Sequence, residues 1–137
     1  GLITKNTNSD VRVAIKSLFY LASEPGLDVD TAFGRANKDV VVDVIHDLND
    51  RCLLILESVR RSQTGFVREV YQRYKNLSQA AGEVPFSYMH FYNHLSYLQS
   101  CGLILLVATK VGRAYTNQIR LLFDPEVESS TFKARFG

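Results

Sequence analysis

A β-hairpin near the end of the chain constrains the fold more than any other feature of the sequence. The stretches LILLVAT (103–109) and NQIRLLF (117–123) are short and rich in branched apolar residues, which favours strands over helices. Between them lies KVGRAYTN (110–117), in which a glycine, two cations and a tyrosine interrupt the apolar sequence. We therefore predict an antiparallel hairpin whose connecting loop leaves the core and meets either water or a polyanion.

Three helices are predicted before this hairpin. Apolar residues recur at helical spacing in the segments 51–63, 66–82 and 86–101. Asn49 is expected to cap the first of these helices and Thr64 the second. Three helices followed by a hairpin form the winged helix-turn-helix arrangement, whose third helix is the one that enters a DNA major groove.

This winged-helix domain is predicted over 49–137, and residues 1–48 are predicted to form a separate helical unit. The first helix of that unit is expected to begin at a Ser9 cap, to end near Pro25 and to be followed by a short second helix that stops at Asn37. A third helix is expected over 40–48. The predicted buried stripe of the first helix consists of Val11, Ala14, Ile15, Leu18, Phe19 and Ala22. The tail from Asp124 opens with an Asp-Pro turn signal and is expected to pack loosely.

The predicted elements make the fold mainly α, and length and composition support a globular chain of one ordinary domain or two small ones. Hydrophobic residues make up 46% of the 137 residues and charged residues 22%, values that argue against disorder. No apolar run approaches the ~18 residues of a membrane helix, and the N-terminus does not resemble a signal peptide. The missing initiator methionine suggests a piece of a longer protein. Cys52 and Cys101 are expected to be buried, reduced thiols of a cytoplasmic protein.

The net charge of +2 is unevenly distributed. Residues 1–49 carry five Lys or Arg and seven acids, a balance of −2, whereas residues 50–137 carry eleven and seven, a balance of +4. The positive charge therefore belongs to the predicted winged-helix domain, where it suits a nucleic-acid surface.

The helix predicted over 86–101 has two distinct faces. At 100° per residue one apolar face is made by Tyr88, Phe91, Leu95 and Leu98. The opposite face is made by Met89, His90, Asn93, Ser96, Tyr97 and Ser100. This second face contains no acid, which is unusual for a solvated helix face and favours contact with DNA. The alternative is a polar surface without a partner.

These features define a set of candidate DNA-binding residues. Candidates for contacts with base edges are Ser87, His90, Asn93 and Tyr97. Candidates on the hairpin are Lys110, Arg113, Tyr115 and Arg120. Further phosphate contacts are expected from Arg60, Arg61 and Lys75. The alternative for the hairpin is a loop that is charged only for solubility.

No catalytic or metal-binding motif is recognisable. His90 and His94 are one helical turn apart, but neither a glutamate between them nor a third ligand nearby completes a metal site. The phosphate-binding motif GxxxxGK[ST] is absent, as is any local signature of a nucleophile with its base. We therefore predict that this chain is not an enzyme and binds no metal or cofactor by itself.

Two segments resemble the archaeal replication initiators related to the first subunit of the origin recognition complex and to the cell-division-cycle-six loader. NSDVRVAIKSLFYLA (8–22) is similar to the lid helix of these AAA+ proteins, although Ser9 stands where the family more often has glycine. The segment 70–104, with the Gly-Arg hairpin that follows, resembles their C-terminal winged-helix domain. Residues 25–65 match only loosely.

The resemblance implies binding of double-stranded DNA at replication origins, in the nucleoid of the cytoplasm. It also implies that Arg12 occupies the sensor-two position, where it would reach ATP bound with magnesium by a preceding domain that this chain lacks. The replicative helicase and other initiators are further implied partners. Two alternatives are a dimeric winged-helix transcriptional regulator and a winged helix used only for protein contacts.

Overall fold

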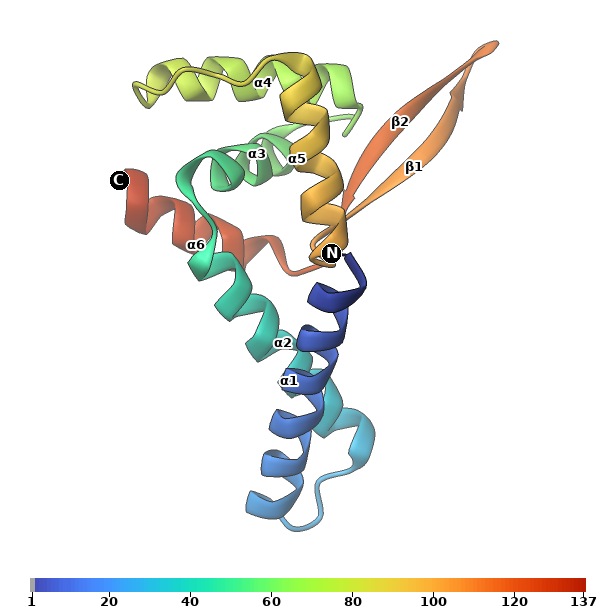
Figure 1. The fold of residues 1–137 in the computed structure, drawn as a ribbon, viewed down its shortest axis with the longest axis vertical. Helices are drawn as coiled ribbons and strands as arrows, with labels where there is room; N and C mark the ends of the chain where they lie inside the picture. Colours follow the sequence, from blue (N-terminus) through green and yellow to red (C-terminus); the bar gives the residue numbers. More distant parts are fainter. Residues whose placement is uncertain (1) are drawn as a thin grey trace. The chain divides into compact units, whose positions relative to one another are not determined.

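The computed structural model describes the backbone of residues 2–137 and the side chains from Asp10 onward (Figure 1). The described part of the chain contains six helices and one two-stranded antiparallel sheet. It divides into two compact units, one ending at Asp47 and the other beginning at Leu48. None of the described helices combines the length and the apolar character needed to cross a membrane.

The first unit is a pair of helices, α1 (Leu2–Ser23) and α2 (Val29–Asp47). The expected end of α1 is confirmed, but the Ser9 cap is wrong because the helix begins at Leu2 and Ser9 lies within it. Also wrong is the predicted break at Asn37, since α2 is continuous. An exposed Asn in a helix interior costs only a fraction of a kcal/mol. The buried residues of α2 recur at helical spacing across that position: Ala32, Ala36, Val40 and Ile45.

The buried face of α1 also differs from the prediction. Val13 and Ser17 are buried, and Val13 packs with Ala36 and Val40 of α2. The predicted stripe lies outside this contact: its four largest members, Val11, Ile15, Leu18 and Phe19, are between 51% and 67% exposed. Apolar residues occupy two faces of α1, and α2 covers only one of them, so spacing alone identifies the wrong face.

The second unit has the predicted winged-helix order. Its elements are α3 (Asp50–Arg61), α4 (Val67–Ala80), α5 (Tyr88–Ser100), β1 (Ile104–Val111), β2 (Ala114–Leu121) and α6 (Pro125–Phe136). The Asn49 cap of α3 is confirmed, because its side chain accepts a hydrogen bond from the Cys52 N–H (2.9 Å). Helix α3 is the centre of the core, with every residue from Cys52 to Val59 buried.

The Thr64 cap of α4 is wrong. Phe66 is the N-cap residue, and it makes no side-chain cap hydrogen bond. Instead the carboxylate of Glu69 accepts hydrogen bonds from the backbone N–H groups of Gln63 (3.1 Å) and Thr64 (3.3 Å). Thr64 thus belongs to the connection between α3 and α4, where it hydrogen-bonds to Glu69.

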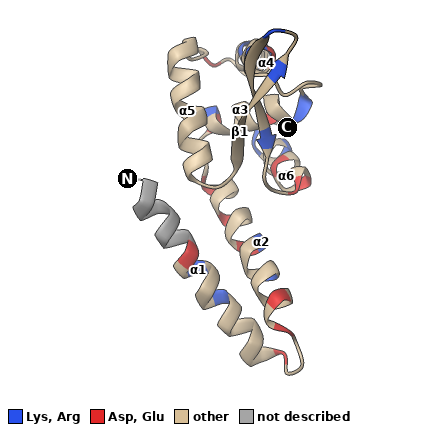
Figure 2. Cartoon of the chain, turned by 90° about the vertical axis from the view of Figure 1, so that its right-hand side faces the viewer, with Lys and Arg blue, Asp and Glu red and all other residues tan. Residues whose placement is uncertain are grey.

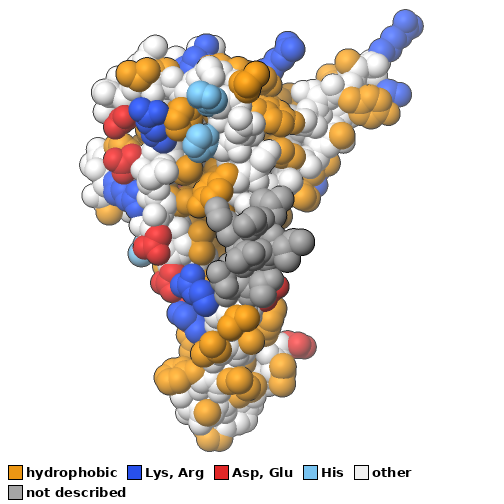
Figure 3. All heavy atoms as spheres, in the orientation of Figure 1, with side chains coloured by type: hydrophobic (Ala, Val, Ile, Leu, Met, Phe, Trp, Pro, Cys, Tyr) orange, Lys and Arg blue, Asp and Glu red, His pale blue; other side chains and the backbone are white. Residues whose placement is uncertain are grey.

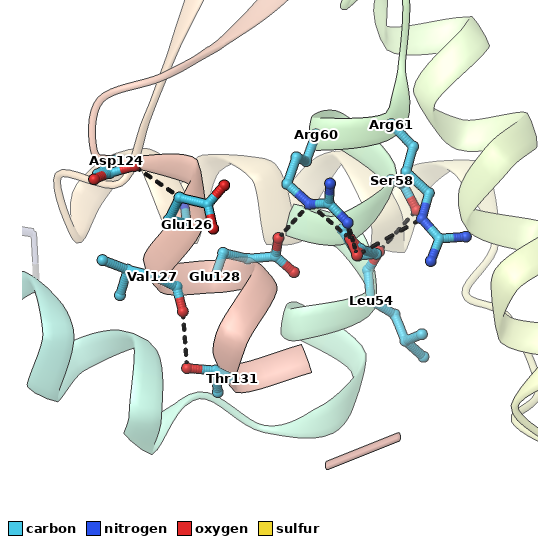
Figure 4. A network of polar contacts seen from close by, with 10 residues as sticks. Leu54, Ser58, Arg60, Arg61, Asp124, Glu126, Val127, Glu128 and Thr131 are labelled. Atoms are coloured by element: carbon cyan, nitrogen blue, oxygen red, sulfur yellow. Dashed lines mark hydrogen bonds and ion pairs between the residues drawn. The ribbon is translucent and has the colours of Figure 1, made fainter. Parts of the chain in front are cut away.

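The C-terminal tail was predicted to pack loosely, and this is wrong because it forms α6. Asp124 caps this helix by accepting a hydrogen bond from the Glu126 N–H (3.0 Å), and Pro125 begins it. Helix α6 packs on α3 through the fully buried Glu128, whose carboxylate is 3.1 Å from the Arg60 Nε (Figure 4). Arg60 also binds the fully buried Glu57. Two buried carboxylates that share one guanidinium therefore fix α6 to the core.

The hairpin is longer and its turn shorter than predicted. Strands β1 and β2 pair from Ile104 opposite Leu121 to Val111 opposite Ala114, so that only Gly112 and Arg113 form the turn. Gly112 has a φ of +62° whereas Arg113 does not have a positive φ, which is the pattern of a type II′ turn. Most of the segment 110–117 is therefore strand rather than loop.

Of the two cysteines, Cys52 is buried as predicted, and burial raises the pKa of its thiol to about 11. Cys101 follows the last residue of α5 and is only partly buried, so the prediction of a second buried thiol is wrong.

Candidate nucleic-acid interface

Helix α5 is anchored to the core along one face and begins at a well-formed cap. The Ser87 hydroxyl accepts a hydrogen bond from the His90 N–H (3.3 Å). Phe91, Leu95 and Leu98 are fully buried, as predicted. Phe91 packs against the ring of Tyr74 in α4, with ring centroids 5.3 Å apart. This packing determines which side of α5 faces the solvent.

The outer face of α5 contains most of the predicted residues. Met89 is 72% exposed, and His90, Asn93, Ser96 and Tyr97 are also exposed. Ser100 is buried and hydrogen-bonds to the Tyr97 carbonyl (2.6 Å), so its predicted place on this face is wrong. Tyr88 is 43% exposed rather than buried, with its ring edge against Tyr71. The outer face consequently has no Lys, Arg, Asp or Glu and carries the aromatic rings of His90 and Tyr97 and the amide of Asn93.

The cations of the hairpin are exposed and unpaired. Among the described residues, no ion pair or hydrogen bond involves the side chains of Lys110, Arg113 or Arg120. Figure 2 marks Lys and Arg positions in blue on the hairpin, and Figure 3 shows Lys or Arg side chains at its tip. Arg113 lies in the turn itself, and Lys110 pairs across the hairpin with the exposed Tyr115.

The pairing register separates these residues between the two faces of the hairpin. Side chains opposite each other in an antiparallel pair share a face, and successive residues alternate. Lys110 and Tyr115 therefore share the face of Asn117, whose amide hydrogen-bonds to the Tyr92 hydroxyl of α5. Arg120 belongs to the opposite face. The structure thus brings Lys110 and Tyr115 to the side of α5 and leaves Arg120 on the other.

Hydrogen bonds along both edges hold the base of the hairpin in place. The Leu106 N–H donates to the Gln99 side chain of α5 (2.7 Å), and the opposite residue, Ile119, donates to the Gly65 carbonyl (2.8 Å). Phe66 also forms a β-bridge with Gln118. The hairpin is therefore clamped between α5 and the connection that precedes α4, which sets its orientation relative to α5.

The absence of acids extends beyond the outer face of α5. From Val84 to Phe123 the sequence contains no Asp or Glu, and its charged residues are Lys110, Arg113 and Arg120. This segment contains α5, β1 and β2 in full. The acids of the second unit lie in α3, α4, α6 and the connections around them.

The other predicted binding residues make ion pairs or a ring contact within the chain. The Arg60 guanidinium is bound to Glu57 and Glu128, which removes it from the candidate interface. Arg61 lies 3.6 Å from the Glu57 carboxylate, and the Lys75 ammonium sits 4.9 Å from the centre of the Tyr71 ring. In the first unit, Arg12 makes an ion pair with Asp43 (3.2 Å).

The histidine pair of α5 makes structural contacts. The His94 Nδ1 lies 2.8 Å from the His90 carbonyl oxygen, and its ring stacks on Phe86 with centroids 4.2 Å apart. Within the part of the chain that the structure describes, no group of three or more His, Cys, Asp or Glu side chains is arranged to hold a metal ion.

Some residues that shape the interface were not predicted. Tyr92, Gln99 and Asn117 orient the hairpin on α5 through the hydrogen bonds described above. Helical spacing and strand alternation do not reveal such contacts, because they depend on which side of the hairpin meets α5. Asn117 was expected where the loop meets the second strand, and only the observed pairing and its hydrogen bond place it beside Tyr92.

Comparison with known proteins places this fold in a family. The chain resembles the solved structure of the Aeropyrum pernix Orc1 protein in complex with DNA, with a TM-score of 0.68 and 22% identity over 79% of this chain and 30% of that one. It also resembles Cdc6p from Pyrobaculum aerophilum, with a TM-score of 0.50 and 15% identity over 94% of this chain and 37% of that one. The chain thus spans about a third of either protein.

None of the curated proteins matches the chain. A model of the family described as the C-terminal winged helix domain of CDC6 matches residues 51–129, which cover more than half of the sequence and run from α3 into α6. The predicted resemblance is therefore confirmed, and the chain belongs to the family of CDC6 C-terminal winged helix domains.

Proposed function

We propose that this chain binds double-stranded DNA as the C-terminal part of a replication initiator, and that its sites are replication origins. One observation carries the proposal: α5 and the hairpin are formed by a segment that has no acid and three cations without a partner among the described residues. A surface of this kind attracts the phosphate backbone and repels none of it. The Orc1 structure that shares this fold is a complex with DNA, which supports the same partner for this chain.

The two elements have different tasks in this proposal. Helix α5 carries no Lys, Arg, Asp or Glu, so its outer face contributes hydrogen bonds and apolar contacts to base edges in the major groove. Lys110 and Arg113 at the end of the hairpin contact phosphates or the minor groove of flanking DNA, together with Tyr115. Arg120, on the other face of the hairpin, reaches only a phosphate that lies on that side.

We propose that the longer protein binds ATP with magnesium through a separate domain. Arg12 is the residue of this chain that would reach that nucleotide. Its side chain is 45% exposed and is held by a single ion pair to Asp43, so the guanidinium is accessible to a phosphate. The proposal assigns no catalytic step to this chain itself, and it places the protein with the nucleoid in the cytoplasm. The replicative helicase and other initiators are proposed as further partners.

Fluorescence anisotropy of a labelled random-sequence duplex, titrated with this chain across a salt series, tests the proposal. We expect affinity to fall steeply with salt, with a slope that corresponds to ~3–5 neutralised phosphates. Absence of binding at low salt would refute DNA binding. It would favour a protein partner for the exposed apolar residues at the start of α5, Val84, Tyr88 and Met89.

A further inference from the structure

Most hydrogen-bonding groups on the outer face of α5 are already used within the helix. The Ser87 hydroxyl caps the helix by binding the His90 N–H, and the Ser96 hydroxyl lies 3.5 Å from the Tyr92 carbonyl. The Tyr97 hydroxyl bonds to Cys101, a contact that raises its pKa. Each of these three hydroxyls already uses one of its hydrogen-bonding positions, so its orientation toward a base is constrained by a contact within the chain.

Two polar side chains on this face remain uncommitted. In the described part of the chain, the Asn93 amide makes no hydrogen bond, and the His90 ring makes only an edge contact with Phe86, with centroids 6.5 Å apart. Met89 is one turn before Asn93 and is 72% exposed. Residues three and four apart lie side by side on a helix, so Met89, His90 and Asn93 form one patch.

The chemistry of this patch selects among base pairs. Guanine is most often read by Arg or Lys at its O6 and N7 atoms, and α5 contains neither residue type. An Asn amide pairs with the N6 and N7 atoms of adenine, and an apolar side chain contacts the methyl group of thymine. A thioether that is open to solvent suits that methyl contact, since it gains by burial.

We propose that the patch Met89–His90–Asn93 recognises an A·T step in the major groove, with Asn93 on the adenine and Met89 on a thymine methyl. This inference rests on the proposed DNA binding, and it adds the class of sequence that α5 prefers. Affinity comes from the hairpin cations, so the preference for A·T is carried by the neutral helix alone.

The test begins with selection from a pool of randomised duplexes by the full chain, followed by anisotropy with the enriched duplex. We expect the enriched sequences to contain a conserved A·T step. Replacing its thymine by uracil removes one methyl group and should weaken binding by about fourfold. Replacing its adenine by 7-deazaadenine removes one acceptor and should weaken binding by about 2- to 10-fold.

Variants assign each effect to its residue. Met89→Ala should abolish the response to uracil, and Asn93→Ala the response to 7-deazaadenine. Asn93→Arg should change the preferred base from adenine to guanine, because Arg is bidentate to guanine. Asn37→Ala is the matched control: it removes an exposed helical Asn from the first unit and should leave every preference unchanged. Ala favours helix more than Asn does, so these Ala variants retain the fold, which circular dichroism verifies.

The outcomes separate this inference from the function on which it rests. Salt-dependent binding with guanine at the conserved positions, or with no conserved A·T step, would overturn the inference and leave DNA binding intact. An equal loss for Asn93→Ala on enriched and random duplexes would also overturn it. Failure to bind any duplex would refute both.

Discussion

Gly65 joins α3 to α4 at the point where this connection meets β2. Its φ is +75°, and a Cβ atom at this position would lie 2.9 Å from the Ile119 carbonyl oxygen, which is backbone and cannot rotate away. The neighbouring hydrogen bond between the Ile119 N–H and the Gly65 carbonyl depends on the same approach. At the scale of one residue, the absence of a side chain is what allows the hairpin to close on the helices.

We predict that Gly65→Ala destabilises the second unit by more than ~2 kcal/mol, since it adds this clash to the ~1–2 kcal/mol of left-handed strain in a non-glycine residue. Gly82→Ala is the matched control: Gly82 has the same φ of +75° but no atom within 4 Å of a Cβ. It should cost only the strain, ~1–2 kcal/mol. Urea unfolding followed by circular dichroism measures both, and equal losses would show that the close approach to β2 is unimportant.

A second prediction at this scale concerns Glu128. Burial raises the pKa of its carboxyl to about 7 from an ordinary value of 4.5, and the charge of Glu57 adds to this effect while Arg60 opposes it. Between these two values the folded protein binds more protons than the unfolded chain. The contribution of Glu128 to stability is therefore fully present below pH 4.5 and is lost as the pH rises through 7, by an amount on the order of 3 kcal/mol.

Glu128→Gln should remove this slope and raise the free energy of unfolding at pH 8. Urea unfolding at several pH values from 5 to 8 measures it. The titration of Glu69 lies below this pH range, because its pKa is lowered to about 2, first of all by the hydrogen bond from Thr64. Glu126→Gln changes an exposed carboxylate two residues earlier and serves as the control. A wild-type stability that is constant from pH 5 to 8 would contradict the prediction.

At the scale of elements, the position of the hairpin depends on a few hydrogen bonds along its edges. The Leu106–Ile119 pair directs both of its N–H groups outward, one to Gln99 and the other to Gly65. This arrangement uses the free edges of a two-stranded sheet, which would otherwise be open to solvent or to another chain. The sheet is therefore part of the helical domain rather than an isolated hairpin, which would be only marginally stable.

We predict that Gln99→Ala loosens the hairpin without unfolding the domain. The Leu106 N–H loses its acceptor, so its hydrogen exchange should accelerate by about 2- to 10-fold, the equivalent of one neutral hydrogen bond. The affinity for every duplex should fall together, because the hairpin cations are less well oriented. NMR-detected exchange measures the first effect. Gln79→Ala, an exposed Gln of α4, is the control, and a Leu106 exchange rate equal to that of the control would contradict the role of Gln99.

Local sequence signals were sufficient for most of the second unit and insufficient elsewhere. Helical spacing, the Asn49 cap and the Gly112 turn predicted α3, α4, α5 and the hairpin, since each depends on neighbours in the chain. The ordering of α6 depends on Arg60, which is 68 residues away from Glu128, and a buried Glu is not anticipated from composition. The buried face of α1 likewise depends on which side α2 covers.

In the candidate site, too, local signals predicted some features, whereas others depend on contacts between distant parts of the chain. Exposure of His90, Asn93 and Tyr97 followed from the angle of each residue around α5, once the apolar face was recognised. The alternation of β2 predicted that Arg120 points outward but did not predict which face of the hairpin meets α5. That relation is decided by the contact between Asn117 and Tyr92, and it places Arg120 on the other face.

For the whole molecule, the arrangement of charge matters more than its total. In the second unit Asp50, Glu57, Glu69, Glu83 and Glu128 all form ion pairs. These pairs neutralise five acids around the helical core, and the segment that forms α5 and the hairpin has none. A net charge of +2 for the chain therefore coexists with a strongly positive hairpin.

Arg113 tests whether this field is used for binding DNA. It is exposed in the hairpin turn and makes no ion pair among the described residues, so the charge is available to a phosphate. We predict that Arg113→Ala weakens binding to all duplexes about equally and reduces the slope of log K against log salt by ~0.9, the value for one neutralised phosphate. Lys133→Ala removes an exposed cation from α6, outside the acid-free segment, and should leave the slope unchanged. Anisotropy across a salt series measures both slopes. If the two variants change the slope equally, DNA responds to the net charge of the chain and not to the hairpin, whereas a loss confined to Arg113→Ala locates the phosphate contact at the turn.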